Sequence, residues 1–263
     1  MGAAEKKIAD WLIENPDKII SLSISDLAER CRCGEATIVR FARRLGFGGY
    51  QELKISLAKE QGTVEVSNTI EKTDSCFEIF EKVSYDIYRS LEMTKQCLDE
   101  DALEEAAKTI MKARRIMIFG LGNSAAVALD FQHKLMRIGL DATSYSDNHM
   151  QAISVSHSTK ADVVIGISHS GSSRDIVNAL KIAKENGATT IAVTNQGKSP
   201  IISVSDIALY TSSNETKYRL LGLNSRIAQL AIVNSIYYYI ICKDNKRQNT
   251  IKNTELALQD KKF

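Results

Sequence analysis

A hydroxyl-rich segment, SHSGSS at residues 168–173, sets four serines and a histidine around one glycine. An apolar run at 163–167 precedes it, and a helical pattern opens at Arg174. Each hydroxyl can donate one hydrogen bond to a phosphate oxygen, and the first N–H groups of a helix add further donors. The segment therefore predicts a binding loop for a phosphate monoester. The competing interpretation is that the serines only cap the helix.

A second loop of similar chemistry, GLGNS at residues 120–124, follows the apolar run at 116–119 and precedes another helical pattern. Glycines let the backbone approach an anion closely at a helix N-terminus. The spacing Gly120-x-Gly122-x-x-Ala125 also matches a dinucleotide fingerprint, so an NAD-binding redox regulator is an alternative. Two such loops at the carboxyl ends of parallel strands favour a compact phosphorylated ligand, because a dinucleotide site normally has one.

Two other side chains are candidates for the same sheet edge. His149 follows the second expected strand, and Glu215 follows the strand expected at 207–210. Glu215 can accept hydrogen bonds from sugar hydroxyls or can be an exposed loop carboxylate, and His149 can reach a ligand or be a neutral structural histidine. No carboxylate pair and no Ser/His/Asp order has a spacing that demands catalysis.

A different chemistry lies near the N-terminus, where residues 30–44 hold five arginines and one glutamate. Ile38, Phe41, Ala42 and Leu45 have helical spacing and predict a buried face over a helix at 35–45. The opposite face is expected to carry the DNA-contacting residues Ala36, Thr37, Arg40, Arg43 and Arg44.

The residues before this basic helix complete a recognisable motif. Ser23 and Asp26 fit a capping box that opens a helix ending near Cys31, and a turn with Gly34 follows. A short helix, a tight turn and a basic amphipathic helix are typical of a helix-turn-helix, whose second helix enters the major groove. Thr37 and Arg40 are expected to read bases, and the rim arginines to meet phosphates. The alternative is a helical bundle with a solvated basic face.

These motifs belong to two differently patterned parts of a chain of 263 residues. We expect an all-α helix-turn-helix domain at 1–60, a polar linker at 61–73, and a domain at 74–263. In that last domain, helices over 74–113 lead into βαβ units and a parallel sheet. Phe77 and Phe80 keep a helical spacing at its start.

Composition narrows the class of protein. With 44% hydrophobic and 25% charged residues, the chain is typical of a globular protein rather than a disordered one. No apolar run is long enough for a membrane helix, and the N-terminus lacks a secretory pattern, so we expect a cytoplasmic protein with free thiols. Cys31 and Cys33 have no further ligand pair nearby, so neither a metal nor a cofactor is expected.

Both parts together resemble the RpiR-type family of bacterial transcription regulators, which join an RpiR-type helix-turn-helix to a sugar isomerase (SIS) domain. The N-terminal resemblance rests on SDLAE at 25–29, EATIVRF at 35–41 and LGFGGYQELK at 45–54. The C-terminal resemblance rests on IFGLGNS at 118–124, ISHSGSS at 167–173, GATTIAVTN at 187–195 and SRIAQL at 225–230. Gly34 stands where the family often has a serine that caps the recognition helix.

The resemblance implies a three-layer αβα, flavodoxin-like second domain and a phosphosugar effector. It also implies a homodimer or homotetramer that binds double-stranded DNA at a palindromic operator. Carried over by position, the phosphate-binding hydroxyls would be those of Ser124, Ser168, Ser170 and Ser173, with backbone contacts from Gly122, Asn123 and Gly171.

We therefore interpret the chain as a DNA-binding regulator of carbohydrate metabolism genes that senses a sugar phosphate and is not an enzyme. The main alternative is a phosphosugar isomerase with an accessory helical domain, in which Glu215 or His149 would serve as the general base. An isomerase has no use for a basic recognition helix, and this favours the regulator.

Overall fold

The computed structural model describes residues 2–15, 18–19, 22–60, 70–213 and 223–259. The chain forms two compact units, an N-terminal unit built mainly from residues up to Ser90 and a C-terminal unit built mainly from the residues after it. The linker expected at 61–73 lies largely outside the described residues. None of the described helices is long and apolar enough to cross a membrane.

Up to residue 60, the N-terminal unit contains four short helices, α1 (Ala3–Glu14), α2 (Ile24–Arg30), α3 (Glu35–Arg44) and α4 (Tyr50–Glu60). The capping box predicted at the start of α2 is confirmed. The Asp26 N–H donates to Ser23 Oγ over 3.1 Å, and the Ser23 N–H donates to Asp26 Oδ2 over 3.2 Å. These two bonds satisfy donors that the helix itself leaves free, and so fix where α2 begins.

The core of the N-terminal unit is formed by apolar side chains from all four helices. Ile38, Phe41 and Ala42 of α3 are buried in it, as their spacing predicted. The prediction that Leu45 shares this face is wrong, because its side chain is 50% exposed. Its N–H caps the last turn of α3, so Leu45 already belongs to the turn that leaves the helix.

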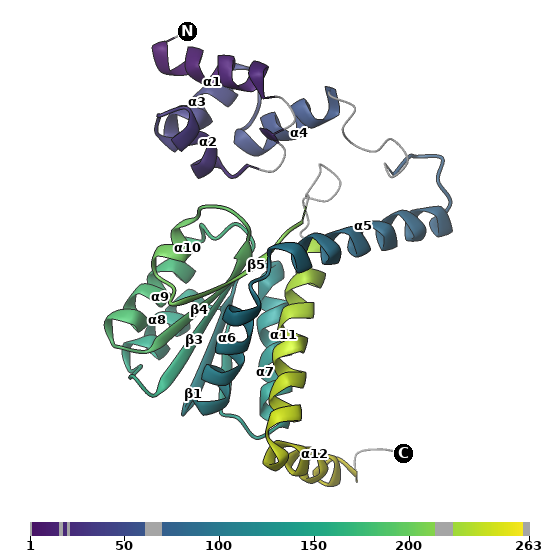
Figure 1. Cartoon of the computed structure of the whole chain (residues 1–263), viewed down its shortest axis with the longest axis vertical. Helices are drawn as coiled ribbons and strands as arrows, with labels where there is room; N and C mark the ends of the chain where they lie inside the picture. The colour runs from purple at the N-terminus through teal and green to yellow at the C-terminus, as the bar shows by residue number, and fades with distance from the viewer. Residues whose placement is uncertain (1, 16–17, 20–21, 61–69, 214–222, 260–263) are drawn as a thin grey trace. The chain divides into compact units, whose positions relative to one another are not determined.

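The C-terminal unit is built on a parallel sheet in the strand order β2-β1-β3-β4-β5. The strands are β1 (Arg115–Gly120), β2 (Ala142–Tyr145), β3 (Asp162–Ser168), β4 (Thr189–Asn195) and β5 (Ile207–Thr211). One face packs on α6 (Glu100–Lys112), α7 (Asn123–Arg137) and α11 (Leu223–Lys243), and the other on α8 (Asn148–Ser156), α9 (Arg174–Glu185) and α10 (Pro200–Ser203) (Figure 1). The predicted three-layer αβα architecture with a flavodoxin-like strand order is confirmed.

Two further helices are α5 (Cys76–Cys97), which precedes α6 in the chain and belongs mostly to the N-terminal unit, and α12 (Asn245–Ala257), which follows α11 in the C-terminal unit. The helical prediction for 74–113 holds, with a break at Asp99, whose carboxylate accepts the Ala102 N–H and so starts α6. Phe77 and Phe80 keep their helical spacing but are 68% and 63% exposed, so the spacing there does not mark a buried face. The sequence patterns did not predict α12.

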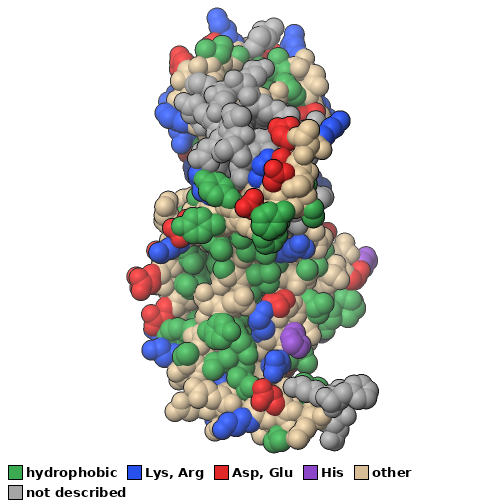
Figure 2. Space-filling model, turned by 90° about the vertical axis from the view of Figure 1, so that its right-hand side faces the viewer, with side chains coloured by type: hydrophobic (Ala, Val, Ile, Leu, Met, Phe, Trp, Pro, Cys, Tyr) green, Lys and Arg blue, Asp and Glu red, His purple; other side chains and the backbone are tan. Residues whose placement is uncertain are grey.

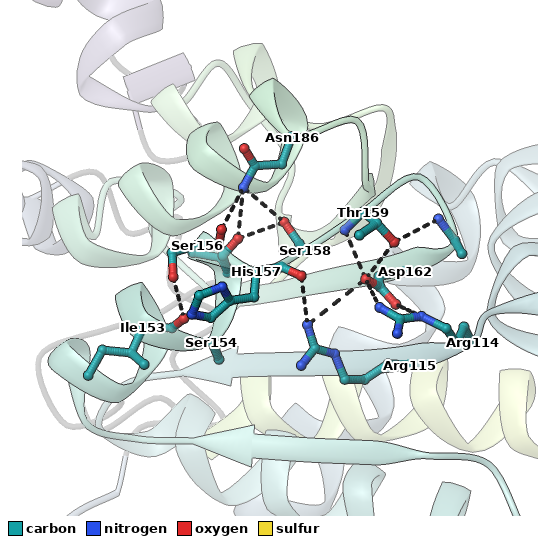
Figure 3. Close-up of polar contacts among 12 residues, drawn as sticks. Arg114, Arg115, Ile153, Ser154, Ser156, His157, Ser158, Thr159, Asp162 and Asn186 are labelled. Atoms are coloured by element: carbon teal, nitrogen blue, oxygen red, sulfur yellow. Dashed lines mark hydrogen bonds and ion pairs between the residues drawn. The ribbon is translucent and has the colours of Figure 1, made fainter.

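The amino edge of the sheet is fixed by a buried carboxylate at the start of β3 (Figure 3). The side chain of Asp162 accepts two hydrogen bonds from Arg114, at 3.0 and 2.8 Å, and two from Thr159, at 2.8 and 3.0 Å. Burial alone would raise the pKa of Asp162, but the hydrogen bonds from Arg114 and Thr159 outweigh it and lower that pKa. The folded state therefore favours the ionised carboxylate.

We expect Asp162→Asn to lower the free energy of unfolding by about 2 kcal/mol at neutral pH, because Arg114 loses its charged partner. A carboxyl with a lowered pKa stabilises the fold above its ordinary pKa of about 4, and this stabilisation is lost as the pH falls through the lowered value. Denaturant titrations from pH 7 to pH 3 should therefore show wild type losing more stability than the variant. The exposed Asp141→Asn should change stability by less than about 0.5 kcal/mol, and equal effects of both changes would contradict this account.

Candidate functional site

The two predicted phosphate loops meet at the carboxyl edge of the sheet, between β1 and β3. These strands pair in parallel, with Gly120 opposite Ile167, so the loops that follow the two strands leave the sheet at the same level. The strand order reverses here, since β2 lies on one side of β1 while β3, β4 and β5 follow on the other. Ligands of open α/β sheets bind at such a switch point.

The first loop is a turn that only glycines permit. A Cβ atom on Gly120 would lie 2.4 Å from the main-chain oxygen of Ser124, so the strand backbone touches the first turn of α7 directly. Gly122 has φ +55° and ψ −125°, a conformation that side chains disfavour. The turn therefore places the N-terminus of α7, with Asn123 and the half-buried Ser124, at the end of β1.

The second loop brings two hydroxyl groups together. The hydroxyl oxygens of Ser168, at the end of β3, and Ser173, just before α9, lie 3.3 Å apart. Although Ser173 occupies the N-cap position of α9, its side chain makes no capping hydrogen bond. At Ser173, this geometry argues against the interpretation that the serines only cap the helix.

The backbone of this loop is held by its neighbours. Gly171 is buried with φ +61°, and its carbonyl accepts the Ile201 N–H over 3.0 Å. The His169 carbonyl accepts the Asn195 N–H of β4 over 3.1 Å. Ser170 lies exposed at the tip, where its hydroxyl accepts the Ser172 N–H over 3.3 Å. The loop is thus positioned by β4 and α10.

The other predicted effector residues are less central. His149 is exposed in the first turn of α8, which follows β2 at the edge of the sheet beside β1. His149 thus lies at the carboxyl edge, after β2, and β1 separates that strand from β3 and its serine loop. Glu215 lies outside the described residues.

Two polar residues near this edge were not predicted from the sequence. Gln229 of α11 is 1% exposed and Ser213, just after β5, is 7% exposed. Neither Gln229 Nε2 nor Ser213 Oγ has a hydrogen-bond partner. The available signal was a glutamine on the apolar stripe of α11, one turn before Ile232 and Val233.

The predicted DNA-contacting face of α3 is solvent-facing, but its members differ. Arg40 is exposed, and its Nη2 lies 3.5 Å from Thr37 Oγ1. Arg43 Nε donates to the Gly48 carbonyl over 3.4 Å, and Arg44 pairs with Glu5 of α1 over 2.9 Å. The side chains of Thr37 and Arg40, next to the exposed Ala36, thus make no hydrogen bond or ion pair outside α3 among the described residues, whereas Arg43 and Arg44 also brace the bundle.

The turn between α2 and α3 has an unusual backbone. Arg32 has φ +50°, and within the described ranges no other non-glycine residue has a positive φ. The Arg32 N–H donates to the Glu29 carbonyl and the Cys33 N–H to the Ala28 carbonyl, at 3.0 and 2.9 Å. This is the Schellman arrangement, in which glycine normally occupies the position of Arg32.

The turn holds two cysteines. Cys31 is buried and Cys33 half-buried, and burial raises the pKa of both thiols. Across the part of the chain that the structure describes, no three His, Cys, Asp or Glu side chains are grouped to hold a metal ion.

Both parts of the chain match known protein families. Residues 1–63 match the family model of the rpiR-family helix-turn-helix domain, and residues 109–238 match the SIS domain. The chain is 36% identical to an uncharacterised HTH-type transcriptional regulator of Caldanaerobacter subterraneus, over 99% of this chain and 93% of the relative. It is 33% identical to the HTH-type transcriptional regulator HexR of Pseudomonas aeruginosa, over 89% of this chain and 82% of HexR.

A solved structure shares the fold across the whole chain. The Vibrio vulnificus NanR protein, in complex with ManNAc-6P, aligns with a TM-score of 0.81 and 24% sequence identity. The alignment covers 100% of this chain and 95% of NanR.

We expect Arg32→Gly to raise the free energy of unfolding of the N-terminal unit by about 0.5–1 kcal/mol, because glycine adopts a positive φ without steric cost. Arg32→Ala keeps the Cβ atom and should bring no such gain. Trp11, in α1, is the single tryptophan of the chain, so its fluorescence during denaturant unfolding reports on this unit. A glycine variant that is less stable than the alanine variant would contradict the strain argument.

Proposed function

We propose that this chain is a DNA-binding regulator controlled by a phosphorylated sugar. The premise is that it belongs to the HTH-type transcriptional regulators that join an rpiR-family helix-turn-helix to a SIS domain. The observation that supports the effector site is the pair of hydroxyls of Ser168 and Ser173, which lie 3.3 Å apart at the switch point. Ser173 occupies the N-cap position of α9, but its side chain makes no capping hydrogen bond.

On the DNA side, α3 is the recognition helix. Thr37 and Arg40 are free to meet base edges, and an arginine can donate two hydrogen bonds to guanine O6 and N7. Arg43 and Arg44 stand at the rim, where each arginine can contact a phosphate in addition to its contact within the bundle. Ala36 has no polar side chain and is suited to the methyl group of thymine.

On the effector side, the phosphate is bound by hydroxyls and backbone N–H groups at the N-termini of α7 and α9. The hydroxyl donors are those of Ser124, Ser168, Ser170 and Ser173, with backbone contacts from Gly122, Asn123 and Gly171. Both helix dipoles favour an anion at this position. His149 and Glu215 are proposed to contact the sugar part.

The protein acts in the cytoplasm as a homodimer or homotetramer on a palindromic operator. Figure 2 shows hydrophobic side chains gathered on one face of the C-terminal unit. Leu129 and Met136 of α7 and Tyr238 of α11 are among the exposed large hydrophobic residues of this unit. Exposed apolar surface of this kind supports contact with another copy of the chain, as symmetric operators require.

Regulation follows if the effector binds two states of the protein unequally. A ligand shifts an equilibrium only by its difference in affinity for the two states. The sugar phosphate must therefore bind more tightly to either the DNA-competent or the DNA-incompetent form, and this determines whether it recruits or releases the operator.

We expect Arg40→Ala to weaken binding to an operator selected with the wild-type protein by about tenfold or more, and to weaken binding to unrelated DNA much less. Arg43→Ala, which removes a phosphate contact, should weaken binding to both DNAs alike. Fluorescence anisotropy at fixed salt measures each affinity. Wild-type operator affinity in the Arg40 variant would show that α3 does not read bases.

Replacing Ser168 and Ser170 together by alanine is expected to abolish the effect of the sugar phosphate on operator binding, since two phosphate donors are lost. Operator affinity without effector should stay at the wild-type value. The matched control replaces Ser156 and Ser203, exposed serines that each donate to a carbonyl of their own helix, over 2.7 and 2.8 Å. A normal effector response of the Ser168/Ser170 variant would place the effector elsewhere.

A further inference from the structure

Gln229 Nε2 and Ser213 Oγ are among the buried polar atoms of the C-terminal unit that lack hydrogen-bond partners. Both side chains are more than nine-tenths buried. Buried polar atoms in folded proteins are almost always paired with protein, water or ligand, so each exception needs an explanation.

The direction of α11 places Gln229 at the carboxyl edge of the sheet. This helix follows β5, and α12 after it contacts the far end of α7, where Arg247 donates to the Ile138 and Gly139 carbonyls. The helix α11 therefore runs from the carboxyl edge towards the amino edge. Gln229 lies one turn before Ile232 and Val233, so it ends the apolar stripe on the side of the ligand edge.

Gln229 also lies on the same side of the sheet as the glycine turn after β1. The buried side chains of α7 and α11 belong to one cluster on this side, which includes Phe131 and Ile236. Ser213 follows the carboxyl end of β5, and its N–H donates to Asn195 Oδ1 at the end of β4 over 3.2 Å. Both unpartnered atoms thus lie towards the edge at which the two phosphate loops end.

The chemistry of these groups differs from that of the serine loop. Gln229 Nε2 can only donate, Ser213 Oγ can donate or accept, and both side chains are neutral. Such a pair fits hydroxyl or carbonyl oxygens and offers no charge to a second phosphate. We propose that Gln229 and Ser213 form a subsite for the carbohydrate part of the effector; this inference rests on the proposed function and adds a carbohydrate-selecting position to the same site.

A buried glutamine whose amide donor is already used is available for comparison in the same unit, although its Oε1 has no partner. Gln151 of α8 is also 1% exposed, and its Nε2 donates to the Tyr145 carbonyl over 2.6 Å. The donor of Gln151 is therefore used within the fold, whereas the donor of Gln229 is not. Replacement by methionine, which has nearly the same shape, should consequently affect the two sites in opposite ways.

The test measures melting temperature and ligand affinity for wild type, Gln229→Met, Ser213→Ala and Gln151→Met. Calorimetric titration uses two probes, a panel of pentose, hexose and N-acetylhexosamine phosphates, and glycerol 3-phosphate, which carries a phosphate without a sugar ring. Gln229→Met should melt at or above the wild-type temperature, because it removes an unpaired buried donor, while Gln151→Met should melt lower.

With the panel member that wild type binds most tightly, Gln229→Met should lose about tenfold in affinity and Ser213→Ala a smaller factor. Affinity for glycerol 3-phosphate should stay unchanged in both. Unchanged affinity for that sugar phosphate, or a lowered melting temperature of Gln229→Met, would overturn the subsite while leaving the proposed function intact. A wild-type protein that binds no member of the panel would overturn both.

Discussion

The direct contact between the end of β1 and the first turn of α7 is the constraint on which the proposed effector site depends. Any side chain at position 120 would collide with the main chain of Ser124, so only a turn of two residues, Leu121 and Gly122, separates the strand from the helix. The parallel pairing of β1 with β3 then brings the serine loop to the same edge. Two helix N-termini and several hydroxyls are thereby concentrated at one point by backbone geometry alone, and binding phosphate requires little reorganisation.

The two edges of the sheet differ in how their polar side chains are hydrogen-bonded, and this difference supports the proposed site at the carboxyl edge. At the amino edge, the buried charge of Asp162 receives four hydrogen bonds and serves stability. At the carboxyl edge, Ser173 leaves its helix uncapped, and Gln229 and Ser213 leave polar atoms unpaired. Unpaired buried polar groups carry a cost, and at the carboxyl edge a bound ligand can offset it.

Much of the architecture could be predicted from the sequence because local signals agreed with the global fold. The capping box at Ser23, the strands of the sheet and the glycine turns were all legible, and the family resemblance is confirmed by the matches to both domain models. The pattern failed where the outcome depends on tertiary structure. Leu45 has the spacing of a core residue but falls one position beyond the helix, and Arg32 adopts a conformation that composition gives no reason to expect. The sequence did not distinguish Gln229 from any other residue of its helix. Spacing shows which face of a helix a residue occupies, but not whether its amide donor has a hydrogen-bond partner.

The division of work within the effector site bears on how a regulator of this kind responds to its ligand. The serine loop is already tied to β4 and α10, so the phosphate binding proposed for it would require no change of state there. Affinity that is equal in two states shifts neither, and the coupling between effector and operator must come from contacts that differ between them. Coupling of 1–3 kcal/mol, about 5–150-fold, is typical of such systems and corresponds to one to three hydrogen bonds. Groups beyond the rigid loop, such as those that contact the carbohydrate, are therefore the better source of the response, and by reciprocity operator DNA must change the affinity for the sugar phosphate by the same factor.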